Sequence, residues 1–157
     1  MNLKEGDLIS GHNVAIGKYM GIGEVDGCAG TQFHRIYDMQ KEAIHYIPLD
    51  KLESVRKLPA KSTVMKNLEI FKIGKLIDSG EIEGSRYQYF SQKLAKQKFK
   101  NEIEVFHDLT VLKEQKGATI GESKLWNSLK ERLVFEMTFV LSCKKPDVEK
   151  LLQLSQA

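Results

Sequence analysis

The chain has 157 residues, of which 41% are hydrophobic and 29% are charged, and its formal net charge is +3. This composition is typical of a folded globular protein with one domain or two small ones. No apolar run approaches the roughly 18 residues needed to cross a bilayer, and residues 1–7 lack the apolar core of a secretory signal. We therefore expect a cytoplasmic protein without a membrane partner.

Short β-type runs separated by glycine fill the first 60 residues. Residues 8–9, 14–23, 33–39 and 42–47 are rich in β-branched and aromatic side chains, and Pro48 ends the last of these runs. About five short strands at hairpin spacing predict a small Tudor-like or SH3-like β-barrel, in which strand glycines permit sharp bends. The predicted first domain is residues 1–60.

The pattern becomes helical after Pro59, and residues 61–157 form the predicted second, all-α domain of about five helices. Helices are expected over residues 62–71, 86–98 and 102–113, a long one follows a capping box at residues 119–122, and a short one starts at Pro146. Trp126 lies within the apolar stripe of the long helix, which favours a core position. The fold class is therefore α+β.

Positive charge is concentrated in the second half of the chain. Residues 1–60 hold seven Lys and Arg against eight Asp and Glu, whereas residues 61–157 hold 17 against 13. The segment 86–100 contains five cations and no acid. We predict that its lysines at 3–4 spacing share one helical face that meets phosphates; a solvated helix face is the alternative.

Nothing in the sequence indicates catalysis or a bound cofactor. The four histidines have no metal-ligand spacing, although His34 and His45 face each other if they share a hairpin. Cys28 and Cys143 are far apart in the sequence and are expected to be reduced. The glycines of residues 17–23 are not followed by a helix, so they are strand glycines rather than a phosphate loop. We expect no enzyme activity, no metal and no cofactor.

The order of short motifs resembles the CarD/CdnL family of bacterial transcription regulators. Residues 3–7 (LKEGD) are similar to the family's opening F-K-x-G-D, and residues 45–56 are similar to its strand-to-proline segment. The second half follows the family pattern without a gap, with RY at 86–87, KL at 93–94, EVFHDL at 104–109, KG at 116–117, TIGE at 119–122 and LVFE at 133–136. The resemblance covers nearly the whole chain.

The resemblance implies a Tudor-like module that binds the RNA polymerase β subunit through an exposed strand edge. The residues assigned to this contact are Arg35, His45, Tyr46, Ile47 and Pro48. It also implies a helical module that contacts promoter DNA weakly, without sequence specificity, and stabilises the open complex. The residues assigned to DNA are Arg86, Lys93, Lys96 and Lys100. Polymerase anchoring raises the local concentration of such a weak DNA binder.

The sequence departs from the family pattern at the residue that wedges into the minor groove. Family members place a tryptophan there, whereas this chain has Glu83 or Gly84. The opening turn at residues 10–14 also differs, and Tyr46 stands where arginine is frequent. A second hypothesis is therefore a protein-interaction adaptor with the same fold, a non-polymerase partner and no DNA contact. The exposed strand edge is compatible with a monomer or a domain-swapped dimer.

Overall fold

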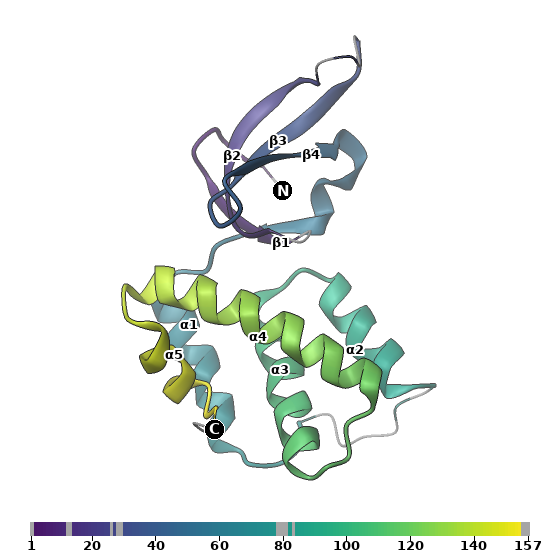
Figure 1. Ribbon diagram of the computed structural model, residues 1–157, viewed down its shortest axis with the longest axis vertical. Coiled ribbons are helices and arrows are strands. Elements are labelled where there is room, and N and C mark those ends of the chain that lie inside the picture. Colours follow the sequence, from purple (N-terminus) through teal and green to yellow (C-terminus); the bar gives the residue numbers. More distant parts are fainter. Residues whose placement is uncertain are drawn as a thin grey trace. The chain divides into compact units, whose positions relative to one another are not determined.

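The computed structural model describes residues 2–11, 14–25, 27, 30–77, 82 and 84–154. The chain divides into two compact units, Met1–Leu58 (unit 1) and Pro59–Ala157 (unit 2). Figure 1 shows strands in unit 1 and helices in unit 2. This arrangement confirms the predicted α+β class. The predicted boundary lies two residues further along the chain, and the functional roles assigned to the two halves stay predictions.

Unit 1 is a five-stranded antiparallel sheet in the order β4-β3-β2-β1-β5. The strands are β1 (Leu8–Gly11), β2 (Val14–Glu24), β3 (Gln32–Asp38), β4 (Ala43–Pro48) and β5 (Val55–Lys57), with the 3-10 helix η1 (Leu49–Ser54) before β5. One face of the sheet is buried, because Ile9, Ile36 and Ile47 are fully inaccessible to solvent and belong to one cluster of buried side chains. This face forms the core of unit 1.

The predicted closed barrel is not found among the described residues. The sheet is open, and its two outer strands, β4 and β5, pair with β3 and β1 respectively rather than with each other. The strand β5 has three residues, and η1 occupies the connection that leads to it. Because β5 pairs with β1 and not with β4, the six residues of β4 form a free edge of the sheet among the described strands.

Glycines in β2 permit the bends that the sequence predicted. Gly21 has φ of +83° and lies in the register shift between Tyr19 and Ile22, so the strand bends at a residue that tolerates this conformation. A Cβ atom on Gly17 would lie 2.4 Å from Cγ2 of Ile36. The close approach of β3 to β2 therefore requires glycine at position 17.

Unit 2 contains the five predicted α-helices. They are α1 (Lys61–Leu68), α2 (Arg86–Ala95), α3 (Phe99–Glu114), α4 (Ile120–Leu141) and α5 (Lys145–Leu151), with the 3-10 helix η2 (Glu69–Lys72) after α1. The helix α4 is the longest and packs against α3 and α5 (Figure 1). The core includes Phe106, Ile103, Leu133 and Met137, none of which has accessible surface.

The boundary between α2 and α3 differs from the sequence prediction. We predicted helices over residues 86–98 and 102–113, but α2 ends at Ala95 and α3 begins at Phe99. Gln97 between them has φ of +48°, and Phe99 is 6% exposed. Burial of Phe99 at the start of α3 requires the chain to turn before it. The single helical face predicted for Lys93, Lys96 and Lys100 is therefore wrong, because Lys100 belongs to another helix.

Candidate functional site

The free edge strand β4 carries four of the five residues predicted to contact a polymerase, and the fifth, Arg35, lies on the neighbouring strand β3. Cross-strand pairs place Arg35 opposite Tyr46 and Phe33 opposite Pro48. Because side chains alternate along a strand, these four residues share one face of the sheet, away from the core. Tyr46 is 39% exposed, and its ring meets that of Phe33 edge-on at 6.3 Å between centroids.

An exposed apolar surface continues along this face. Tyr37 pairs with Ile44 on β4, and these side chains are 37% and 44% exposed. We call Tyr37, Ile44 and Tyr46 the outer apolar patch. An unpaired strand edge beside exposed apolar side chains is a surface that another strand can extend.

Arg35 lies flat on the sheet rather than pointing freely into solvent. Its Nη2 atom donates to the Met20 carbonyl at 3.1 Å, and a Cβ atom on Gly23 would lie 2.7 Å from Nε. Nε itself is buried and has no hydrogen-bond partner among the residues that the structure describes. Glycine at position 23 therefore makes room for the Arg35 side chain.

Two of the predicted polymerase-contact residues point inward. Ile47 has no exposed surface and belongs to the core. His45 lies with Nε2 3.3 Å from Oδ2 of the buried Asp38. Asp38 in turn accepts hydrogen bonds from the backbone N–H groups of Gln40 and Lys41, so it fixes the turn between β3 and β4. The structure thus brings Arg35, Tyr46 and Pro48 together on the outer face but not His45 and Ile47.

His34 and His45 do not pair across the hairpin, because His34 lies opposite Ile47 and His45 opposite Ile36. The ring of His34 is buried, and its Nδ1 is 2.8 Å from the Tyr19 hydroxyl. The part of the chain that the structure describes contains no group of three metal-ligating side chains. His12 and Cys28 lie outside the described residues.

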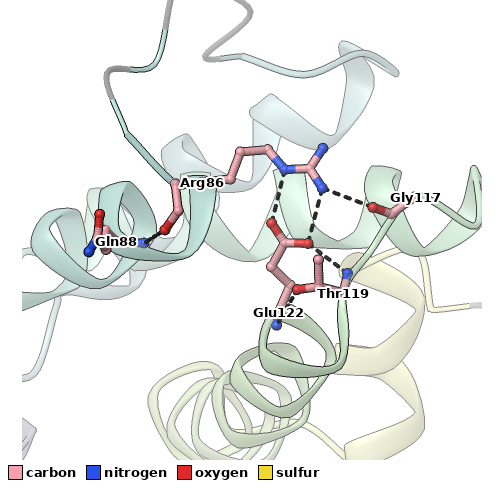
Figure 2. A network of polar contacts seen from close by, with 6 residues as sticks. Arg86, Gln88, Gly117, Thr119 and Glu122 are labelled. Atoms are coloured by element: carbon pink, nitrogen blue, oxygen red, sulfur yellow. Dashed lines mark hydrogen bonds and ion pairs between the residues drawn. The ribbon is translucent and has the colours of Figure 1, made fainter.

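Arg86, predicted to contact DNA, joins α2 to the start of α4 (Figure 2). Its Nε donates to Oε1 of Glu122 at 2.9 Å, and its Nη2 donates to Oε2 of Glu122 at 3.2 Å and to the Gly117 carbonyl at 2.9 Å. The Glu122 side chain is 1% exposed, whereas that of Arg86 is 39% exposed. The N–H groups on Nε and Nη2 of Arg86 are therefore already bound, although these are donors that would grip a phosphate.

Glu122 also completes the predicted capping box of α4. Its carboxylate accepts from the Thr119 backbone N–H at 2.7 Å, while the Thr119 hydroxyl accepts from the Glu122 N–H at 3.2 Å. Burial raises the pKa of Glu122, but the hydrogen bonds from the Thr119 backbone and the Arg86 side chain outweigh burial. The pKa therefore lies below its ordinary value. The carboxylate stays ionised and holds both partners.

The three lysines predicted to contact DNA differ in their exposure to solvent and in their pairing with acids. The Lys93 ammonium lies 2.8 Å from Oε2 of Glu104, and both side chains are nearly buried, at 12% and 13% exposure. Lys100 lies 3.5 Å from Oε1 of the same carboxylate but is 71% exposed. Lys96 is exposed at the end of α2. Glu104 therefore compensates two of these lysines, and Lys96 stays available to solvent.

Two positions, 83 and 84, are candidates for the place of the family's wedge tryptophan. Glu83 lies outside the described residues. Gly84, the other candidate, is exposed and has φ of +86°. The residues 12–13 of the opening turn also lie outside the described residues.

Two lysines lie over the ring of Trp126, an arrangement that the sequence did not reveal. Its indole stacks on Phe106 at 5.6 Å between centroids, and its Nε1–H donates to Oγ1 of Thr110 at 2.9 Å. The ammonium groups of Lys113 and Lys130 lie 3.9 and 5.3 Å from the centroid of the same ring. The prediction that Trp126 packs against the core is confirmed. The lysines come from different helices, so no local motif indicates that they meet.

None of the helices in the described part of the chain combines the length and apolar character that a membrane span requires.

Comparison with protein families matches residues 64–153 to the CarD C-terminal domain. The match begins within α1, ends just after α5 and covers more than half of the chain. A search of curated proteins gave no match.

Proposed function

Because the chain belongs to the CarD family, we propose that it is a non-catalytic transcription regulator that binds the RNA polymerase β subunit and contacts promoter DNA. The single observation that carries this proposal is the family match over the helical unit. In this proposal, unit 1 anchors the protein to the polymerase and unit 2 modulates the stability of the open complex. Tethering raises the concentration of unit 2 near DNA, so a weak contact suffices.

The free edge of β4 supports the polymerase contact. Backbone groups of an unpaired strand provide affinity through main-chain hydrogen bonds, while neighbouring side chains select the partner. Tyr46 and Ile44 are exposed beside this edge, and Arg35 is fixed across the same face. We assign the contact to this edge and to the outer apolar patch, with His45 and Ile47 supporting it from the core side.

A binding experiment with the isolated polymerase β lobe tests the proposal. The full chain is immobilised, and retention of the lobe is compared for the wild type, the variant Ile44→Lys plus Tyr46→Lys, and the control Ile22→Lys. Ile22 is 49% exposed on β2, so the control adds a lysine to the same sheet away from the edge. We expect the double variant to weaken binding at least tenfold and the control to bind like the wild type. A folded wild type that retains no lobe contradicts the proposal.

A second candidate function is the protein-interaction adaptor without a DNA contact. The observation that favours it is the internal pairing of Arg86, Lys93 and Lys100 with Glu122 and Glu104. Gel-shift binding to fork-junction DNA, with and without polymerase, separates the two functions. A polymerase-dependent shift caused by the protein supports the regulator. Lobe binding without any effect on DNA supports the adaptor.

A further inference from the structure

Lys113 on α3 and Lys130 on α4 carry their ammonium groups to one indole ring. The two nitrogens lie 3.9 and 5.3 Å from the centroid of Trp126. Phe106 stacks on one face of this indole with an interplanar angle of 17°, so the closely placed Lys113 ammonium must cover the other face. The negative potential of the ring attracts both cations. The arrangement therefore holds two positive charges together at the junction of two helices.

The indole is a fixed support for these charges. Its N–H is bound to Thr110 Oγ1 at 2.9 Å, and the Thr110 hydroxyl donates to the Phe106 carbonyl at 2.8 Å. Both the orientation of the ring and its packing partner are thus set by α3. Because one face is packed and the other is covered by lysine, the ring is not open for stacking with a base.

The charge of this pair is not compensated within the described part of the chain. No carboxylate there forms an ion pair with Lys113 or Lys130, whereas Glu122 pairs with Arg86 and Glu104 with Lys93. Both ammonium groups lie close to the same ring, so their charges repel each other, and a shared anion offsets that repulsion. Arg86, Lys93 and Lys100 of the predicted basic segment pair with acids, whereas its exposed Lys96 and Lys98 and the two lysines over Trp126 form no ion pair with a described carboxylate.

We propose that Lys113 and Lys130 bind the phosphate backbone of duplex DNA over Trp126. This inference rests on the proposed function and moves its DNA contact from the segment 86–100 to the junction of α3 and α4. Duplex DNA fits because it offers closely spaced phosphates, and residues 61–157 carry an excess of positive charge. Since the indole offers no free face to a base, the contact is independent of sequence.

Fluorescence of the full chain tests the site directly, because Trp126 is the chain's one tryptophan. Two 30-base-pair duplexes of unrelated sequence are titrated at several salt concentrations, and anisotropy of labelled duplex gives the affinities. The variants are Lys113→Gln plus Lys130→Gln and, as a control, Lys96→Gln plus Lys98→Gln, which removes two exposed lysines between α2 and α3. Polyglutamate serves as a non-nucleic-acid polyanion.

We expect a saturable change in wild-type emission that is equal for both duplexes and absent with polyglutamate. The Lys113→Gln plus Lys130→Gln variant should reduce the slope of log affinity against log salt by about two, since each lost phosphate contact removes roughly 0.9. The control should keep the emission change. Its slope of log affinity against log salt should fall less than that of the Lys113→Gln plus Lys130→Gln variant.

Three results would overturn the inference: an unchanged slope in the Lys113 and Lys130 variant, an equal response to polyglutamate, or no binding of duplex by the wild type. These failures are distinguishable from failure of the proposed function, which is measured by retention of the polymerase β lobe. A protein that retains the lobe but whose salt slope does not depend on Lys113 and Lys130 refutes this site alone.

Discussion

Arg86 and Glu122 are 36 positions apart in the sequence, yet their side chains form a two-bond ion pair of 2.9 and 3.2 Å. The arginine is the first residue of α2, and the glutamate closes the capping box of α4. The pair therefore ties the starts of two helices to each other. This explains why a cation that the sequence assigns to DNA lies against a buried carboxylate.

Replacement of Arg86 should destabilise unit 2. The Arg86→Gln variant leaves a nearly buried carboxylate with its capping bonds alone, and we expect a loss of about 1–2 kcal/mol, reduced from the usual cost because Arg86 is partly exposed. Urea unfolding followed by Trp126 fluorescence measures the change, with the exposed Lys96→Gln as the control. Unchanged stability combined with weaker DNA binding would return Arg86 to the role of a phosphate ligand.

The lowered pKa of Glu122 predicts a dependence of stability on pH. Burial raises this pKa, but the Thr119 and Arg86 hydrogen bonds lower it more, so the folded value lies below the ordinary value of 4.5. The resulting stabilisation is fully present above that ordinary value and is lost as pH falls through the folded pKa. The stability difference between the wild type and Glu122→Gln should therefore shrink from pH 7 to about pH 3.

Urea unfolding of both proteins at several pH values measures this difference, and Glu131→Gln, an exposed site on the same helix, serves as the control. A constant difference across the range would mean that the ionised form of Glu122 is not preferentially stabilised by folding.

Local signals were sufficient for most of the elements of the fold. The threonine and glutamate of residues 119–122 predicted the start of α4, and the glycines of β2 predicted its bends. The turn between α2 and α3 was misplaced because its left-handed residue is Gln97 rather than glycine. Barrel closure was wrongly predicted because strand count and spacing do not determine whether the two outer strands meet.

Several contacts of the candidate site join residues of different helices, which no local pattern in the sequence contains. Lys93 and Lys100 have helical spacing in the sequence, but a turn separates them, and Glu104 on α3 compensates both. Lys130 follows Trp126 on α4 at the i, i+4 spacing of a helix, whereas Lys113 precedes Trp126 by 13 positions, and the packing of α3 on α4 brings Lys113 to the same ring. Charge counted along the chain therefore does not distinguish the cations that pair with acids from those that do not.

The two lysines that share Glu104 should contribute unequally to stability. Lys93 is nearly buried at 2.8 Å from the carboxylate and lies 5.8 Å from the Tyr89 ring centroid, whereas Lys100 is largely exposed at 3.5 Å. We expect Lys93→Gln to cost about 1–3 kcal/mol and Lys100→Gln less than about 0.5 kcal/mol. Urea unfolding at low and high salt ranks the two variants, and equal effects would show that burial does not distinguish these pairs.

The buried hydrogen bond between Tyr19 and His34 should stabilise unit 1. The Tyr19→Phe variant leaves the Nδ1 atom of a buried histidine without its 2.8 Å partner, and we expect a loss of about 1–3 kcal/mol. Amide hydrogen exchange of β2 and β3 measures the change within this unit. Tyr37→Phe is the matched control, because the Tyr37 side chain is exposed on the outer face of β3. Equal protection in the two variants would contradict a structural role for the Tyr19 hydroxyl.

The hydrogen bond between Trp126 and Thr110 should appear as an energetic coupling of these residues. Trp126→Phe keeps an aromatic ring on Phe106 but removes the Nε1–H donor, whereas Thr110→Val removes the acceptor at 2.9 Å. Each change eliminates the same bond, so the double variant should lose about 0.5–1.5 kcal/mol less than the two single losses combined. Urea unfolding followed by circular dichroism measures all four proteins, since the Phe variants lack tryptophan. Strictly additive losses would mean that packing on Phe106, rather than the bond to Thr110, sets the position of the ring beneath Lys113.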